Sequence, residues 1–247
     1  MMHSKEWYSL WRWPKLWLIL AVVAFVAGWM FWQMIDRYSS LQLSMSALPN
    51  PPTLTETLWQ PWLMTLSQLM LLVVAMSAGF SIAQERSQKT LWYLMINRNS
   101  YLAVVWQKYL PQWLLLLFFL LLMLLAYILL SLGGQLSQQL VATGCLGLVL
   151  LFGWLSALGT WLSSMCHSTG TAVLLNLVVF VGLWVIGGEG VGQSYGLNWL
   201  QLITPVHHFK WLLVGELSVS TLVYFVGGAA CFLWLTAHQL RVLRKSA

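Results

Sequence analysis

Two serines and a histidine in residues 163–167 do not form the arrangement that nucleophilic catalysis requires. Ser163 and Ser164 precede His167 by a few residues, so a hydroxyl group and a base are near each other in sequence. Such a base must also be oriented by a third group, and no acidic residue stands nearby. The glycine run GGEGVG at residues 187–192 lacks the lysine and hydroxyl residues of a phosphate-binding loop. The sequence therefore predicts neither a catalytic site nor an ATP site in this chain.

A metal site is not indicated either. His207 and His208 stand near Glu216, but adjacent histidines do not share a helix face and no further ligand is spaced to complete a site. The three cysteines are odd in number and have no pair spacing: Cys145, Cys166 and Cys231. We predict no disulfide framework, no metal and no cofactor bound by this chain.

The composition predicts a membrane protein. The chain is 60% hydrophobic and 7% charged, where a soluble domain has roughly 25% charged residues. Apolar runs of about 18 residues or more indicate transmembrane helices, because roughly 20 helical residues cross the hydrocarbon core. We predict an all-α membrane protein of one domain, residues 1–247, with six spans at residues 16–35, 58–80, 110–131, 140–163, 171–187 and 220–237.

The distribution of lysine and arginine predicts the orientation of these spans. Six spans place both termini on one side, and that side holds ten of the twelve cations: Lys5, Arg12, Lys15, Arg86, Lys89, Arg98, Lys108, Arg241, Arg244 and Lys245. Cytoplasmic loops carry such an excess of positive charge, so both termini are predicted to be cytoplasmic. The net charge of +6 is explained by this bias, and no basic stripe with stacking aromatics indicates a nucleic-acid partner.

The polar residues inside the predicted spans are amides and hydroxyls. The spans have no charged residue near their centres, which argues against a proton-coupled transporter or a pump with its own relay. Gln68 and Asn176 are the notable central amides. For each of them, an interhelical hydrogen bond is modestly favoured over the alternative role of a polar lining for a translocation path.

Three segments outside the spans have predicted structure. Residues 1–15 place Trp7, Leu10 and Trp11 on one helical face, which predicts an interfacial helix that ends at Pro14. Residues 187–219 contain two short apolar groups separated by Pro205, which predict two short re-entrant helices on the outer side.

The third segment, residues 81–109, is a basic cytoplasmic loop between the second and third spans. A helix is predicted over residues 83–96, with Leu91, Leu94 and Met95 on one face. Glu85 and Lys89 have the spacing of a favourable i, i+4 ion pair on another face. From the pattern alone, this helix either docks a partner protein or covers the ends of the spans.

Several short motifs in this loop resemble those of one known family: Glu85-Arg86, Thr90-Leu91, Leu94-Met95, Ser100, Val104-Val105 and Lys108-Tyr109-Leu110. They are similar to the cytoplasmic loop of ABC-2 type permeases of ABC transporters. Further motifs resemble the gliding-motility type within that class: His208-Phe209, Gly215, Tyr224-Phe225 and Leu235-Thr236. Four residues depart from the family pattern: Gln84, Lys89, Arg98 and Ala103.

The resemblance implies that the chain is the permease subunit of an ATP-driven exporter in a bacterial inner membrane. It implies an ABC ATPase dimer as partner, which binds ATP and Mg²⁺, and a second permease chain; a periplasmic or accessory membrane subunit is also compatible with it. The coupling residues would be Glu85, Arg86, Lys89, Leu91, Leu94 and Met95.

Two other functions remain open at this point. The gliding-motility resemblance is also compatible with a non-transporting membrane scaffold of an envelope assembly, which would need no ATPase. A secondary carrier is disfavoured, because the spans lack buried charge and show no inverted repeat.

Overall fold

The computed structural model of the chain describes residues 14–46, 53–91, 100–188 and 201–245, and these are almost entirely helical. In chain order the elements are α2 (Pro14–Ser46), the π-helical turn η1 (Thr55–Trp59), α3 (Gln60–Ser87), α5 (Tyr101–Tyr109), the 3₁₀ turn η2 (Leu110–Gln112), α6 (Trp113–Gly133), α7 (Gln138–Met165), α8 (Thr169–Ile186), α11 (Pro205–Leu213) and α12 (Val219–Lys245). The predicted all-α fold is confirmed for the described residues.

Six helical stretches are long and apolar enough to cross a membrane, as predicted: Leu16–Gln42, Thr55–Ser87, Tyr101–Gly133, Gln138–Met165, Thr169–Ile186 and Val219–Arg244. Four of them extend well beyond the predicted spans, because helix continues into the polar flanks. The 33 residues of Thr55–Ser87 measure about 50 Å, whereas the hydrocarbon core is about 30 Å thick. The chain is therefore a multi-pass membrane protein whose longest helices exceed the thickness of the hydrocarbon core.

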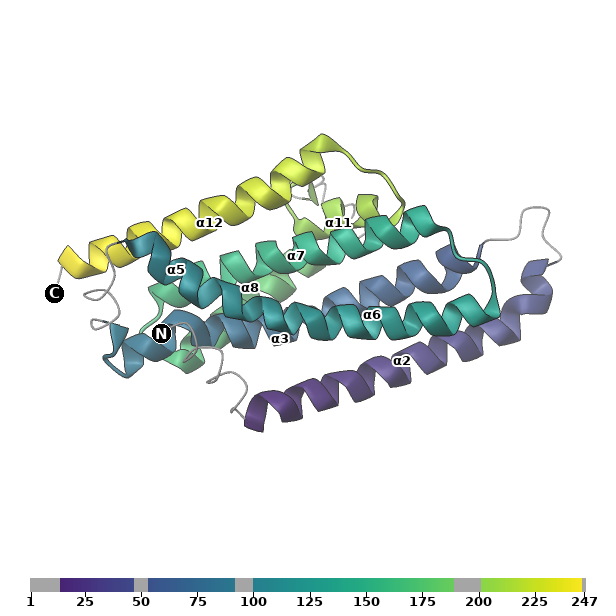
Figure 1. The fold of residues 1–247 in the computed structure, drawn as a ribbon, viewed down its shortest axis with the longest axis horizontal. Coiled ribbons are helices and arrows are strands. Elements are labelled where there is room, and N and C mark those ends of the chain that lie inside the picture. Colours follow the sequence, from purple (N-terminus) through teal and green to yellow (C-terminus); the bar gives the residue numbers. More distant parts are fainter. Residues whose placement is uncertain (1–13, 47–52, 92–99, 189–200, 246–247) are drawn as a thin grey trace.

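α3 and α7 pack against each other and form the centre of the bundle (Figure 1). In the most apolar 18-residue stretch of each of these two helices 61% is buried, compared with 17% in α8. α8 packs along α3, α12 packs along α7, and α11 lies against α7 as well. α2 and α6 make fewer contacts, and α2 lies along one edge of the bundle (Figure 1). Between them, α3 and α7 therefore contact every other long helix of the bundle.

α3 ends, α5 begins and α12 ends at the same end of the bundle, which we call the basic end (Figure 1). Its cations include Arg86, Lys89, Lys108, Arg241 and Arg244. The opposite end holds Arg37 and Lys210 with three acids, Asp36, Glu56 and Glu216. The cytoplasmic location of the basic end stays a prediction that rests on this asymmetry.

The segments outside the spans agree in part with the predictions. The interfacial helix predicted in residues 1–15 lies almost wholly outside the described residues. Of the two short outer helices, the second is present as α11, whereas residues 202–204 form a turn and 189–200 lie outside the described residues. The predicted loop 81–109 is shorter than expected, because α3 continues to Ser87 and α5 begins at Tyr101.

Candidate functional site

At the basic end, α3 ends through a residue in the left-handed backbone conformation. The Lys89 amide donates to the Arg86 carbonyl at 3.2 Å, and the Thr90 amide donates to the Glu85 carbonyl at 2.9 Å. Lys89, between them, has a φ of 59°. This pair of hydrogen bonds is common at the C-terminal ends of helices, where glycine usually occupies the left-handed position. The single helix predicted over residues 83–96 is therefore wrong at residues 88–90, where the chain turns.

α11 ends with the same hydrogen bonds but with glycine at the left-handed position. Gly215 has a φ of 91°, and the Glu216 amide donates to the Trp211 carbonyl at 3.0 Å. The left-handed conformation costs about 1–2 kcal/mol in any residue with a Cβ atom, and glycine avoids this cost.

Replacing Lys89 by glycine is expected to stabilise the protein. The gain should be roughly 1 kcal/mol, because the greater freedom of glycine in the unfolded chain offsets part of the relieved strain. Thermal unfolding in mild detergent would measure it as a higher melting temperature. Lys89→Ala is the matched control, since it removes the charge but keeps the Cβ atom. An equal gain from alanine would show that charge, not backbone conformation, is responsible.

Glu85 joins the end of α3 to α5. One carboxylate oxygen accepts a hydrogen bond from the Lys108 ammonium group at 2.7 Å, and the other accepts one from the Thr90 hydroxyl group. The Lys108 side chain is 9% exposed and that of Glu85 is 22% exposed. The predicted ion-pair partner of Glu85 was Lys89, but Lys89 lies beyond the end of the helix. The observed ion pair joins Glu85 to Lys108, 23 residues further along the chain.

Arg86 joins the end of α3 to the turn between α7 and α8. Its guanidinium group donates to the carbonyls of Ser164 and Cys166, both at 3.4 Å, and lies 2.8 Å from Nε2 of His167. Arginine is only a donor, so His167 must accept through Nε2 and carry its proton on Nδ1. Glu85 and Arg86 thus bind two different neighbours of α3.

The serine and histidine residues first considered for catalysis are engaged in helix contacts. The Ser163 hydroxyl donates to the Gly79 carbonyl at 2.9 Å and accepts from the Ala83 amide at 3.0 Å. The Ser164 hydroxyl donates to the Trp161 carbonyl of its own helix at 2.6 Å. His167 contacts Arg86, and the hydroxyl group of Ser163 connects α7 to α3.

The apolar residues of the predicted docking face are only partly described. Leu91 is 6% exposed and packs with Ile82, Val104 and Leu240, so it belongs to the core of this chain at the basic end. Little of the Leu91 side chain is left for a partner, and its docking role stays a prediction. Leu94 and Met95 lie outside the described residues, and their role stays a prediction. The Lys89 side chain is exposed.

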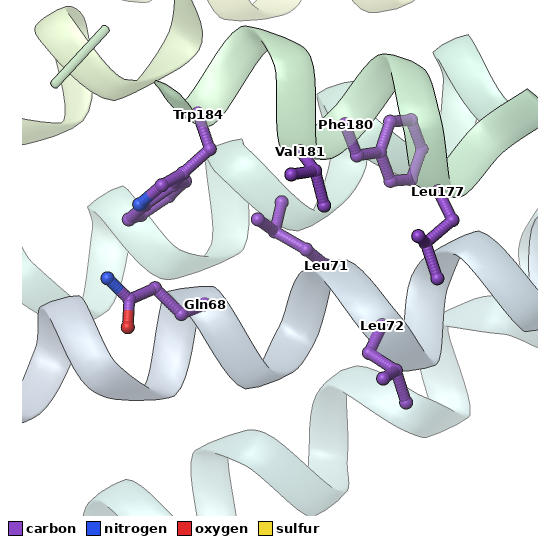
Figure 2. A pocket seen from close by; sticks show the side chains of 7 residues that line it. All are labelled: Gln68, Leu71, Leu72, Leu177, Phe180, Val181 and Trp184. Carbon is purple, nitrogen blue, oxygen red and sulfur yellow. The ribbon is translucent and has the colours of Figure 1, made fainter. Parts of the chain in front are cut away.

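Gln68 lies at a groove between α3 and α8 with a volume of about 300 Å³. Figure 2 shows Gln68 and Trp184 at one end of the groove and Leu72 and Leu177 at the other. The remaining wall residues are Leu71, Phe180 and Val181. The groove is apolar along its length, and its polar groups are gathered at one end.

Asn176 does not line this groove. Its side chain is fully buried, and its amide nitrogen donates to the Ala75 carbonyl of α3 at 3.3 Å. The interhelical hydrogen bond, which was the favoured interpretation, is thus confirmed for Asn176. Its amide oxygen has no hydrogen-bond partner among the described residues. The two central amides of the sequence analysis therefore have different environments.

His207 and His208 belong to α11, and the described residues contain no group of three or more residues of the types that bind metal ions. The His208 ring stacks on Tyr224, with centroids 4.1 Å apart, and its Nε2 lies 3.0 Å from the Leu202 carbonyl. Burial lowers the pKa of His208, the Leu202 carbonyl opposes this effect, and nearby His207 adds to it. The neutral imidazole is therefore favoured in the folded protein.

A destabilisation at mildly acidic pH is expected from His208. Because its folded pKa lies below the unfolded value of about 6.5, its contribution is complete above that pH and is lost as pH falls. The melting temperature should therefore decrease below pH 6.5 in the wild type and decrease less in His208→Gln. His238→Gln, which removes a histidine of α12, is the matched control. Equal pH dependence in all three proteins would contradict this assignment.

Comparison with protein-family models finds no match to the chain, and comparison with curated proteins finds none either.

Proposed function

We propose that this chain is the transmembrane permease subunit of an ATP-driven ABC transporter, an exporter of a bacterial inner membrane. ATP and Mg²⁺ would bind to a separate ATPase dimer, and a second permease chain would complete the membrane part. One observation carries the proposal: a short polar segment at the basic end has both ends bound to the helical bundle. The ABC-2 type motifs of that segment support the same function.

The attachment of this segment explains how a partner could act on the spans. Residues 88–100 connect α3 to α5, and α3 forms half of the bundle centre. Glu85 and Arg86 bind α5 and the end of α7, so displacement of the segment would act on three helices. Leu94 and Met95 remain the proposed apolar docking residues, and exposed Lys89 is the polar one. Because the basic end is proposed to be cytoplasmic, a soluble ATPase could reach it.

The groove between α3 and α8 is the proposed lining of the translocation path. Its walls come from the central α3 and from α8, which is mostly exposed, so a second chain could close it. Gln68 would supply the polar group of that path, whereas buried Asn176 would hold α8 on α3. α11 is proposed to be a re-entrant helix on the outer side, since its nine residues are too few to span the hydrocarbon core.

Purification from native membranes tests this function. A tagged chain would be solubilised in mild detergent, purified, and its bound proteins identified by mass spectrometry. We expect a soluble protein with a Walker motif in near-stoichiometric amount. The matched variant is Leu94→Asp, which should insert normally but retain far less of that protein. Recovery of envelope proteins without any nucleotide-binding protein would contradict the proposal and favour a membrane scaffold.

A further inference from the structure

We infer that the Glu85–Lys108 ion pair is an internal linkage that makes α5 move together with the end of α3, with η2 as the hinge. Glu85 and Lys108 would then be positioning residues that do not contact the partner. This inference rests on the proposed function, because it assigns to the pair the transmission of partner motion into the bundle. It also revises the sequence-based role of Glu85 as a contact to the ATPase.

The burial of the pair indicates its internal role. Both carboxylate oxygens of Glu85 are occupied, one by Lys108 and the other by Thr90. The Lys108 side chain is 9% exposed, and a charge that is buried to this degree needs a partner of opposite sign. A partner that contacted Glu85 would have to share its carboxylate with Lys108 and Thr90. Lys89, in contrast, is exposed and can be reached without any rearrangement.

The backbone between α5 and α6 supplies the hinge. α5 ends at Tyr109, and Leu110–Gln112 form a 3₁₀ turn before α6 begins at Trp113. Pro111 cannot donate an amide hydrogen bond, so the helical ladder is interrupted here. The Gln112 side chain donates to the Lys108 carbonyl at 3.3 Å and compensates in part. Short 3₁₀ stretches within a longer helix often mark hinges.

The remaining contacts of α5 fix its two ends to different helices. At the hinge, the Tyr109 hydroxyl group donates to the Gly153 carbonyl of α7 at 3.1 Å. At the other end, Arg244 of α12 donates to the Tyr101 hydroxyl group at 3.2 Å. Val104 and Val105 are buried in the cluster that also contains residues of α12. A rotation of α5 about its Tyr109 end would therefore move its Tyr101 end against α12.

The test measures a distance first, without any ATPase. Spin labels would be attached to cysteines introduced at Ser87 and Leu102, both exposed, in a variant that lacks the three native cysteines. We expect a narrow distribution of distances between the two labels when Glu85 and Lys108 are both present. In Glu85→Gln and in Lys108→Met the distribution should be at least two-fold broader. The exchange of both residues, Glu85→Lys with Lys108→Glu, should narrow the distribution again. Arg241→Met, which removes an exposed cation of α12, should leave it narrow.

The second readout uses the purified complex with its ATPase. Both single variants should retain the wild-type amount of bound ATPase. The factor by which this chain stimulates ATP hydrolysis should decrease about ten-fold in each of them. The exchanged variant should regain part of this stimulation. A distribution that stays narrow in both single variants would overturn the inference, as would an exchanged variant as broad as the single ones. If no ATPase is recovered, the proposed function fails, while the distances still decide whether the linkage exists.

Discussion

Replacing Gly79 by leucine is expected to destabilise the protein by about 3 kcal/mol, because α3 and α8 approach too closely there for any side chain. A Cβ atom on Gly79 would lie 2.7 Å from Cγ2 of Val173 and 2.9 Å from its Cα atom. The second distance is to backbone, so a rotamer change cannot relieve the clash and α8 must move away. Gly79 also accepts the hydroxyl of Ser163, so the same shift would disturb the contact between α3 and α7.

Unfolding in mild detergent with increasing denaturant would measure this loss. Gly182→Leu is the matched control, because Gly182 lies in α8 and no atom lies within 4 Å of the position its Cβ would take. The control should unfold like the wild type, whereas Gly79→Leu should unfold at a clearly lower denaturant concentration. Similar stability of the two variants would contradict the close packing of α3 on α8.

Replacing Asn176 by aspartate is expected to cost about 3 kcal/mol, the usual penalty for a carboxylate at the centre of a membrane helix. The side chain is fully buried and its amide nitrogen donates to the Ala75 carbonyl. A carboxylate loses this donor and places its charge beside a carbonyl oxygen.

Asn176→Leu should cost less than about 1.5 kcal/mol. It removes one interhelical hydrogen bond, worth about 1 kcal/mol, and it also removes an amide oxygen that has no partner among the described residues. The ratio of folded to unfolded protein after denaturant titration would give both values. If aspartate were tolerated as well as leucine, Asn176 would have to be hydrated, as a residue that lines a path would be.

The six spans could be predicted from sequence because the length of each apolar run is close to the roughly 20 helical residues that cross a bilayer. Their ends could not be predicted in the same way, since helix formation does not stop where hydrophobicity stops. Ser81, for example, was assigned to the loop 81–109, yet it belongs to α3. Burial of Ile82, Val104 and Leu91 in one cluster stabilises these polar helix ends, and that cluster depends on contacts between distant segments.

The partner of Glu85 shows why the candidate site was predicted only in part. The spacing to Lys89 was correct for an ion pair within a helix, but a left-handed residue ends the helix at that position. The observed partner, Lys108, lies beyond the turn on the next helix, and no local rule connects the two positions. The cue available in the sequence was the presence of one acid among four cations in residues 81–109. That cue indicates that a pair exists but does not select which cation forms it.

Three of the side chains proposed to meet a partner at the basic end have contacts within the chain. Glu85, Arg86 and Leu91 are used within the chain, and Lys89 remains exposed. The proposed docking surface is therefore smaller than the sequence indicated, and Leu94 and Met95 carry its apolar part. A docking segment whose two ends are bound to the helical bundle would transmit the motion of a partner to the spans, as the proposed coupling requires.

ATP hydrolysis by the purified complex in proteoliposomes tests the proposed transporter function most directly. The ATPase recovered with the chain would be assayed alone and after reconstitution with the chain, with and without vanadate. The account predicts vanadate-sensitive hydrolysis whose rate changes several-fold when the chain is present. A rate that is the same with and without the chain would contradict the coupling of this protein to an ATPase.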